Sequence, residues 1–169
     1  MRKFFVVVDA QVDFVTGALP NPAAQVAVPK IKAAAEKALA EGYELIFTLD
    51  THHENYMETG EGKHLPVVHC VEGTDGWRIV PELNDLANKA ILLPKEHFGS
   101  ENWREYISEG DEVTMCGFVS SICVISNALA IKQIEGVEVN ILKDCCAGLT
   151  NEDHKAAMTV MKCCQCNIV

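Results

Sequence analysis

The segment Lys3–Asp9, with the sequence KFFVVVD, decides the fold because five consecutive apolar residues end in an acid. A run this short and this continuously apolar is typical of a strand that is covered on both faces. A second run, Glu44–Asp50, has a similar form and also ends in an aspartate. Both runs therefore predict strands of a parallel sheet, each ending in a carboxylate.

Four further β-rich runs follow along the chain: Ala90–Pro94, Glu112–Gly117, Val137–Leu142 and Cys166–Val169. Helical patterns lie between the runs, over Ala23–Glu41, Ser121–Ile134, Thr150–Lys162 and the shorter Glu101–Ser108. Strands that alternate with helices predict an α/β fold, a three-layer α/β/α sandwich around a mostly parallel, six-stranded, Rossmann-like sheet. The length of 169 residues suits one domain over 1–169.

Composition excludes several classes of partner. The chain has 24 acidic and 14 basic residues, a net charge of −10, which argues against nucleic acid and anionic membranes. No apolar run reaches the roughly 18 residues of a membrane helix, and the N-terminus lacks a signal-peptide cleavage site. No phosphate-binding glycine motif is present. We expect a cytoplasmic protein whose eight cysteines are reduced thiols.

Two dense cysteine clusters occur, Cys145-Cys146 and Cys163-Cys164-Gln165-Cys166. Neighbouring cysteines rarely share one metal geometry, so a structural zinc is the less favoured interpretation. We expect these residues to be small members of the core.

Polar residues follow the ends of several predicted strands: Asp9, Asp50, Lys95 and the segment Gly117–Cys123. Ligands bind beyond the carboxyl ends of parallel strands, so these residues should meet at one edge of the sheet. With Ser120 or Ser121 as its cap, the next helix would carry Cys123 in its first turn, where the helix dipole favours a thiolate. We therefore predict a thiol pKa well below about 8.5. Asp9 would accept the thiol proton, and Lys95 would keep Asp9 ionised.

These segments resemble the cysteine hydrolases of the isochorismatase-like superfamily, which includes the nicotinamidases. The pieces that carry the resemblance are Val7–Phe14, Asp50–His52, His69–Thr74, Lys95 and Gly117–Val124. The resemblance implies a catalytic triad of Asp9, Lys95 and Cys123, and a cis peptide bond between Phe118 and Val119. It further implies an oxyanion hole made by the backbone N–H groups of Val119 and Cys123, and a substrate pocket with Phe14 and Phe118.

The resemblance also implies a divalent metal, zinc or else iron or manganese, held by Asp50, His52 and His69, with Glu61 as the fourth ligand. These residues lie in or next to the irregular region Thr51–Lys89, and imidazole and carboxylate groups suit such metals. In the alternative interpretation, His52 and His69 are hydrogen-bonded loop residues. The other histidines, His53, His64, His97 and His154, are expected at the surface.

The resemblance implies hydrolysis of a small amide, with nicotinamide as the first candidate, by a homo-oligomer that is a dimer or a tetramer. The alternatives are another amide or carbamoyl compound, vinyl-ether hydrolysis as in true isochorismatases, or an idle family member. The chain departs from the usual pattern at Ser120-Ser121, at Leu65–His69, where an aromatic residue is missing, and in the short segment Glu96–Ser100. The last two departures concern the substrate.

Overall fold

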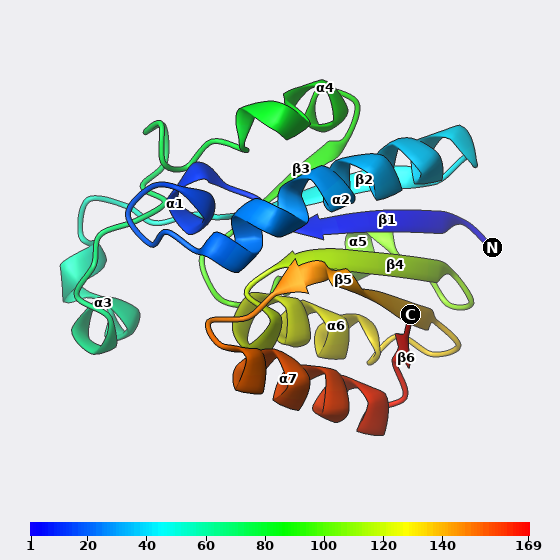
Figure 1. Ribbon diagram of the computed structural model, residues 1–169. Helices are drawn as coiled ribbons and strands as arrows, with labels where there is room; N and C mark the ends of the chain where they lie inside the picture. Colours follow the sequence, from blue (N-terminus) through cyan, green and yellow to red (C-terminus); the bar gives the residue numbers. More distant parts are fainter.

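The computed structural model describes all residues, 1–169, and contains one six-stranded sheet (Figure 1). Its strands stand in the order β3-β2-β1-β4-β5-β6, and every neighbouring pair is parallel. This confirms the predicted sheet. The strands are β1 (Lys3–Val8), β2 (Glu44–Asp50), β3 (Ile91–Lys95), β4 (Glu112–Phe118), β5 (Glu138–Ala147) and β6 (Asn167–Ile168).

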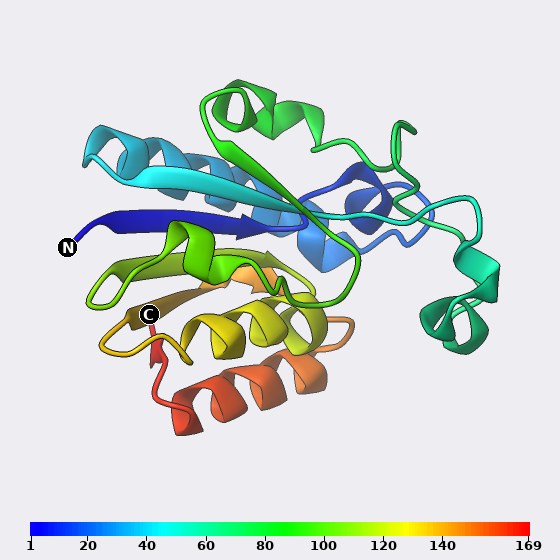
Figure 2. The ribbon, with the colours of Figure 1, turned by 180° about the vertical axis from the view of Figure 1, so that it is seen from behind.

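Helices cover both faces of the sheet, which confirms the three-layer architecture. The long helix α2 (Pro22–Ala40) crosses one face in Figure 1, and α5 (Trp103–Tyr106) and α6 (Ile125–Ile131) lie over the other in Figure 2. Helix α7 (Asn151–Cys163) packs beside α6 and against β5 and β6. The remaining short elements are α1 (Val12–Val15), α3 (Gly60–His64), α4 (Asn84–Ala87), the 3₁₀ turns η1 (Tyr56–Glu58) and η2 (Pro81–Leu83), and the π-helical turn η3 (Ser120–Val124).

Local sequence explains the helix starts. The Asn21 side chain accepts hydrogen bonds from the backbone N–H groups of Ala23 and Ala24, and Pro22 occupies the first position of α2. Thr150 caps α7 by accepting from the Asp153 N–H. None of the helices is long and apolar enough to cross a membrane.

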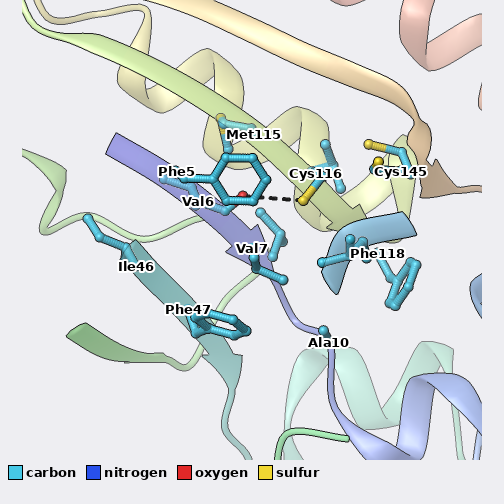
Figure 3. Close-up of a cluster of buried hydrophobic side chains, with 14 of the residues drawn as sticks. Phe5, Val6, Val7, Ala10, Ile46, Phe47, Met115, Cys116, Phe118 and Cys145 are labelled. Atoms are coloured by element: carbon cyan, nitrogen blue, oxygen red, sulfur yellow. Dashed lines mark hydrogen bonds between the residues drawn. The ribbon is translucent and has the colours of Figure 1, made fainter. Parts of the chain in front are cut away.

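The core is centred on β1, whose residues from Phe4 to Val8 are buried. Figure 3 shows Phe5 and Val7 of this strand together with Phe47, Met115 and Phe118 of the two neighbouring strands, all of which belong to the core cluster. The Cys116 thiol lies 3.8 Å from the carbonyl oxygen of Val6 (Figure 3). A continuously apolar strand is therefore buried on both faces, as its sequence predicts.

The cysteine clusters divide between the core and the surface. All eight cysteines are free thiols, and Cys145, Cys146 and Cys166 are buried as expected. Cys163 and Cys164 are exposed, so their predicted place in the core is wrong. The reason is that Cys163 is the last residue of α7 and Cys164 follows it, where the helix end faces solvent.

Strand β5 extends to Ala147, five residues beyond the predicted end. Its pairing with β4 shifts register between Met115 and Gly117 and then resumes with Gly117 opposite Cys146. Gly117 has φ 120°, and a side chain there would overlap the backbone of Val8. The glycine thus permits the close approach of β4 to β1 at the edge where the polar residues gather.

Candidate active site

The strand order reverses between β1 and β4, so the crevice of the sheet opens beyond their carboxyl ends. In Figure 1 the strand arrows point to the end of the molecule where α1 and α3 lie. Asp9 follows β1, Asp50 ends β2 and Lys95 ends β3. Cys123 lies in η3, directly after β4. The predicted convergence of these residues is the arrangement that the structure contains.

Asp9 and Lys95 form a buried ion pair, with 2.7 Å between Asp9 Oδ2 and Lys95 Nζ. The Thr48 hydroxyl donates to Asp9 Oδ1 at 2.6 Å. Burial raises the pKa of Asp9 and the nearby charge of Asp50 adds to this effect, while Lys95 opposes it. A carboxylate whose proton affinity is raised is better suited to accept and return a proton near neutral pH.

Cys123 is buried, with 6% of its surface exposed, yet it lines the cavity described below. Burial raises the pKa of its thiol well above the usual value, and the charge of Asp9 adds to this, whereas Lys95 lowers it. The predicted low thiol pKa is therefore wrong for the free protein. Desolvation of a thiolate outweighs the favourable charge of Lys95. The thiol keeps its proton beside the carboxylate of Asp9.

The turn that carries Cys123 also differs from the predicted helix start. Ser120–Val124 is a π-helical turn rather than the first turn of an α-helix, and no side chain caps it. The fully buried Ser120 instead places its hydroxyl 2.8 Å from Nδ1 of His154 in α7. His154 is therefore half-buried and not the surface residue that was expected. The peptide bond between Phe118 and Val119 is cis, as the resemblance implied.

A second polar group, the histidine–carboxylate cluster, consists of Asp50, His52, Glu61 and His69. One potential ligand atom from each lies within 4.8 Å of all the others. Asp50 Oδ2 is 3.0 Å from His52 Nε2 and 3.5 Å from His69 Nε2, and Glu61 Oε1 is 3.7 Å from both nitrogens. Ligands about 2.1 Å from a zinc ion stand roughly 3.4 Å apart in a tetrahedron.

The cluster fits a divalent metal on the evidence of its donor atoms. His52 Nε2 is buried and has no hydrogen-bond partner of good geometry. The other ring nitrogen of His69, Nδ1, lies 2.7 Å from the Val67 carbonyl oxygen, which directs Nε2 into the cluster. Burial alone would raise the pKa of Asp50, but His52, His69 and Lys95 lower it well below its usual range. The cluster therefore presents an ionised carboxylate and an unpaired imidazole nitrogen to one point.

Supporting residues that sequence reasoning missed hold this arrangement. Gln11 exchanges two hydrogen bonds with the backbone of Asp50, at 2.7 and 2.9 Å. Asp13 accepts from the Cys70 N–H at 2.8 Å, next to His69. Asn127, one helical turn after Cys123, donates a side-chain N–H to the Cys123 carbonyl oxygen at 2.8 Å. Their sequence signal was their polarity at buried or half-buried positions beside the motifs.

A cavity of about 970 Å³ connects the two groups. Cys123, Val119, Phe14 and the four cluster residues line it. Phe118 does not line the cavity, contrary to the prediction, because its side chain points into the core (Figure 3). Alternate side chains of a strand point to opposite faces, so Phe118 can face the core although it lies close to Cys123 in the sequence.

The remaining three histidines, His53, His64 and His97, are exposed, as expected. All three lie at the cavity rather than away from it. His53 Nε2 is 3.2 Å from a carboxylate oxygen of Glu96. They form a polar part of the lining beside the histidine–carboxylate cluster.

Several solved structures share the fold of this chain. The pyrazinamidase of Pyrococcus horikoshii in complex with zinc is 28% identical, with a TM-score of 0.81 over 100% of this chain and 99% of that chain. The pyrazinamidase/nicotinamidase of Streptococcus mutans is 22% identical, with a TM-score of 0.86 over 99% of each chain. The yeast nicotinamidase Pnc1p is 18% identical, with a TM-score of 0.83 over 99% of each chain.

No curated protein matches the sequence significantly. The family model for the Isochorismatase domain matches residues 3–169, which is nearly the whole chain. It spans every strand of the sheet and all residues that meet at its carboxyl edge. The protein is therefore a member of the isochorismatase family of hydrolases.

Proposed function

We propose that the protein hydrolyses the C–N bond of a small primary amide through a thioester on Cys123. The observation that carries the proposal is the meeting of Asp9, Lys95 and Cys123 at the switch point of the sheet, with the thiol at the cavity. We call these three residues the strand-end trio. A nucleophile, a base and a charge that orients the base are the parts that covalent acyl transfer requires.

In the first half of the reaction, the Cys123 thiol gives its proton to Asp9 as the sulfur attacks the amide carbonyl carbon. The backbone N–H groups of Val119 and Cys123 stabilise the oxyanion. Asp9 returns the proton to the nitrogen, the C–N bond breaks and ammonia leaves. In the second half, Asp9 takes a proton from the water that attacks the thioester, the C–S bond breaks, and Asp9 returns this proton to the Cys123 sulfur as the carboxylic acid leaves. Lys95 keeps Asp9 in place throughout.

Asp50, His52, Glu61 and His69 would hold a divalent metal, zinc before iron or manganese. Such an ion, when bound, supplies a Lewis-acid site for a substrate heteroatom. Phe14 lies edge-on to His69, with 5.5 Å between ring centroids, and offers an apolar surface to a flat ring. The zinc complex of the P. horikoshii pyrazinamidase supports this assignment. Nicotinamide is thus the first candidate substrate. We further propose that the protein forms a homo-oligomer, either a dimer or a tetramer.

The test is ammonia release from a panel of nicotinamide, pyrazinamide, aliphatic amides and carbamoyl compounds, each with and without added zinc or manganese. We expect release from at least one carboxamide by the wild-type protein and none by the Cys123→Ala variant. Equal ammonia release by the two proteins would contradict the thioester. Ammonia release from carbamoyl compounds alone would show that the substrate is a carbamoyl compound and not a carboxamide. If no compound releases ammonia, the proposed function is overturned.

A further inference from the structure

The cavity is larger than a single-ring amide requires. It measures about 970 Å³, at the upper end of the roughly 300–1,000 Å³ of ligand pockets. At about 30 Å³ for each water-sized heavy atom, an amide of about nine non-hydrogen atoms fills at most roughly 270 Å³. More than two-thirds of the cavity therefore lies beyond a substrate of that size placed at Cys123.

The cavity lining includes four apolar residues from the start of α2 and from the segments before α2 and α7, namely Leu19, Pro20, Pro22 and Leu149, which we call the apolar wall. Leu149 is 65% exposed. Two other exposed apolar residues, Phe98 and Leu65, line the same cavity. Apolar side chains that gather at an open cavity are typical of a surface that a ligand covers.

Hydrogen bonds hold the apolar wall in place. Asn21, which is nearly buried between two of the wall residues, donates its side-chain N–H to the Gly148 carbonyl oxygen at 3.0 Å. This bond joins the segment before α2 to the segment before α7, which carries Leu149. The backbone N–H of Leu19 donates to the Asp13 carbonyl oxygen at 2.8 Å. The wall is thus a formed part of the fold, assembled from two distant segments.

The charged residues of the cavity lining bear on the chemistry of the distal part of the substrate. The cavity lining contains no lysine or arginine, but it contains five histidines and three acidic residues, Asp50, Glu61 and Glu96. The chain as a whole carries a net charge of −10. The apolar wall itself offers no cationic partner, so a carboxylate placed against it would be desolvated without compensation.

We propose that the natural substrate is a primary amide whose acyl group carries an extended, uncharged apolar arm that lies against the apolar wall. This inference rests on the proposed function and specifies its substrate class. Burial of the arm strengthens binding through the hydrophobic effect, and the lack of a charged partner on the apolar wall disfavours arms that end in a carboxylate.

The experiment compares butyramide, octanamide and octanamide with a terminal carboxylate, and in parallel nicotinamide without and with a butyl group on the ring. In at least one of the two series, aliphatic or nicotinamide, we expect kcat/KM for the amide with the long uncharged arm to exceed that for the short amide at least tenfold. The terminal carboxylate should cancel this gain. Calorimetric binding of the same compounds to the Cys123→Ala protein gives the preference without turnover.

Leu149→Asp should reduce the long-to-short ratio to below threefold. Val160→Asp, at a partly exposed valine on α7 outside the cavity, is the matched control and should keep the full ratio. Equal kcat/KM for long and short amides would overturn the arm but leave the proposed function intact. Arm-dependent binding without any ammonia release would retain the arm and overturn the proposed function. A changed oligomeric state in Leu149→Asp with an unchanged arm preference would assign the wall to contact between two copies of the chain and overturn the inference.

Discussion

The strand-end trio and the histidine–carboxylate cluster lie side by side at one cavity, but the fold positions them in different ways. Asp9, Lys95 and Cys123 stand at or just after three separate strands and are almost completely buried. Of the cluster, only Asp50 belongs to a strand, and the other three residues come from the irregular region after β2. The sheet itself therefore places the trio, whereas side-chain hydrogen bonds from Gln11 and Asp13 position the cluster. The proposed roles follow this division, with bond-breaking assigned to the trio and substrate orientation to the cluster.

The largest effect is expected from Cys123→Ala. Loss of the nucleophile should lower kcat for amide hydrolysis by about a thousandfold or more, because the thioester no longer forms. Cys116→Ala is the matched control, since Cys116 is also buried and lies in β4, but away from the cavity. The control should keep its activity and lose about 1 kcal/mol of unfolding free energy. Retention of more than a few per cent of turnover by Cys123→Ala would refute the nucleophile.

Lys95→Met tests whether the trio is a single electrostatic unit. Removal of the cation leaves the buried carboxylates of Asp9 and Asp50 without their common partner. We expect a loss of about 3–5 kcal/mol in urea unfolding and at least a hundredfold loss in kcat/KM. Lys3→Met removes the exposed pair with Glu112, at 3.8 Å, and should cost less than about 1 kcal/mol. Equal losses in the two variants would show that burial gives Lys95 no special role.

His69→Ala tests the cluster. The variant should lose the divalent metal, measured by elemental analysis, and amide turnover should fall by about 10- to 100-fold as substrate orientation is lost. His64→Ala is the control, because His64 is exposed and lines the same cavity but lies outside the cluster. A full metal content in His69→Ala, or no metal in the wild-type protein even after addition of zinc, would leave His69 as a structural residue.

The pH dependence of alkylation separates thiol acidity from catalysis. The charge of Asp9 raises the pKa of the Cys123 thiol, so Asp9→Asn should shift Cys123 alkylation by iodoacetamide to lower pH. At pH 8 the rate at this site should rise severalfold, while amide hydrolysis falls by at least a hundredfold because the base is missing. Mass spectrometry separates Cys123 from the other cysteines. Slower alkylation in Asp9→Asn would contradict the assigned interaction.

The smallest effect is expected at His154, whose contact with Ser120 links α7 to the turn that carries Cys123. His154→Leu should lower kcat about tenfold with little change in KM, because the oxyanion donors lose their alignment while substrate binding is retained. His154→Asn, whose side-chain amide can replace Nδ1, should restore most of kcat. A purely structural role would lower stability in His154→Leu without this separation of kcat from KM.

The sheet was predictable because six apolar runs alternate with helical patterns, and parallel strands must present their carboxyl ends at one edge. The meeting of Asp9, Asp50, Lys95 and Cys123 follows from that topology. The prediction of a low pKa for the Cys123 thiol was wrong. The local sequence suggests a helix start but does not reveal how deeply the tertiary fold buries the sulfur. The contact of Ser120 with His154 could not be predicted either, since it joins residues 34 positions apart. The place of Phe118 in the core depends on which face of β4 its side chain occupies, which only the folded chain reveals.

Asp50 carries a further consequence, because its two oxygens serve different neighbours. Oδ1 lies 3.3 Å from the Lys95 ammonium, and Oδ2 faces His52 and His69. If the cluster holds the proposed metal, the metal and a reaction that changes the charge near Lys95 would act on one carboxylate, and the two events would be thermodynamically linked. Linkage is reciprocal, so any factor by which the metal tightens substrate binding is also the factor by which substrate tightens metal binding. The affinity for the metal should therefore report on the state of the nucleophile across the cavity.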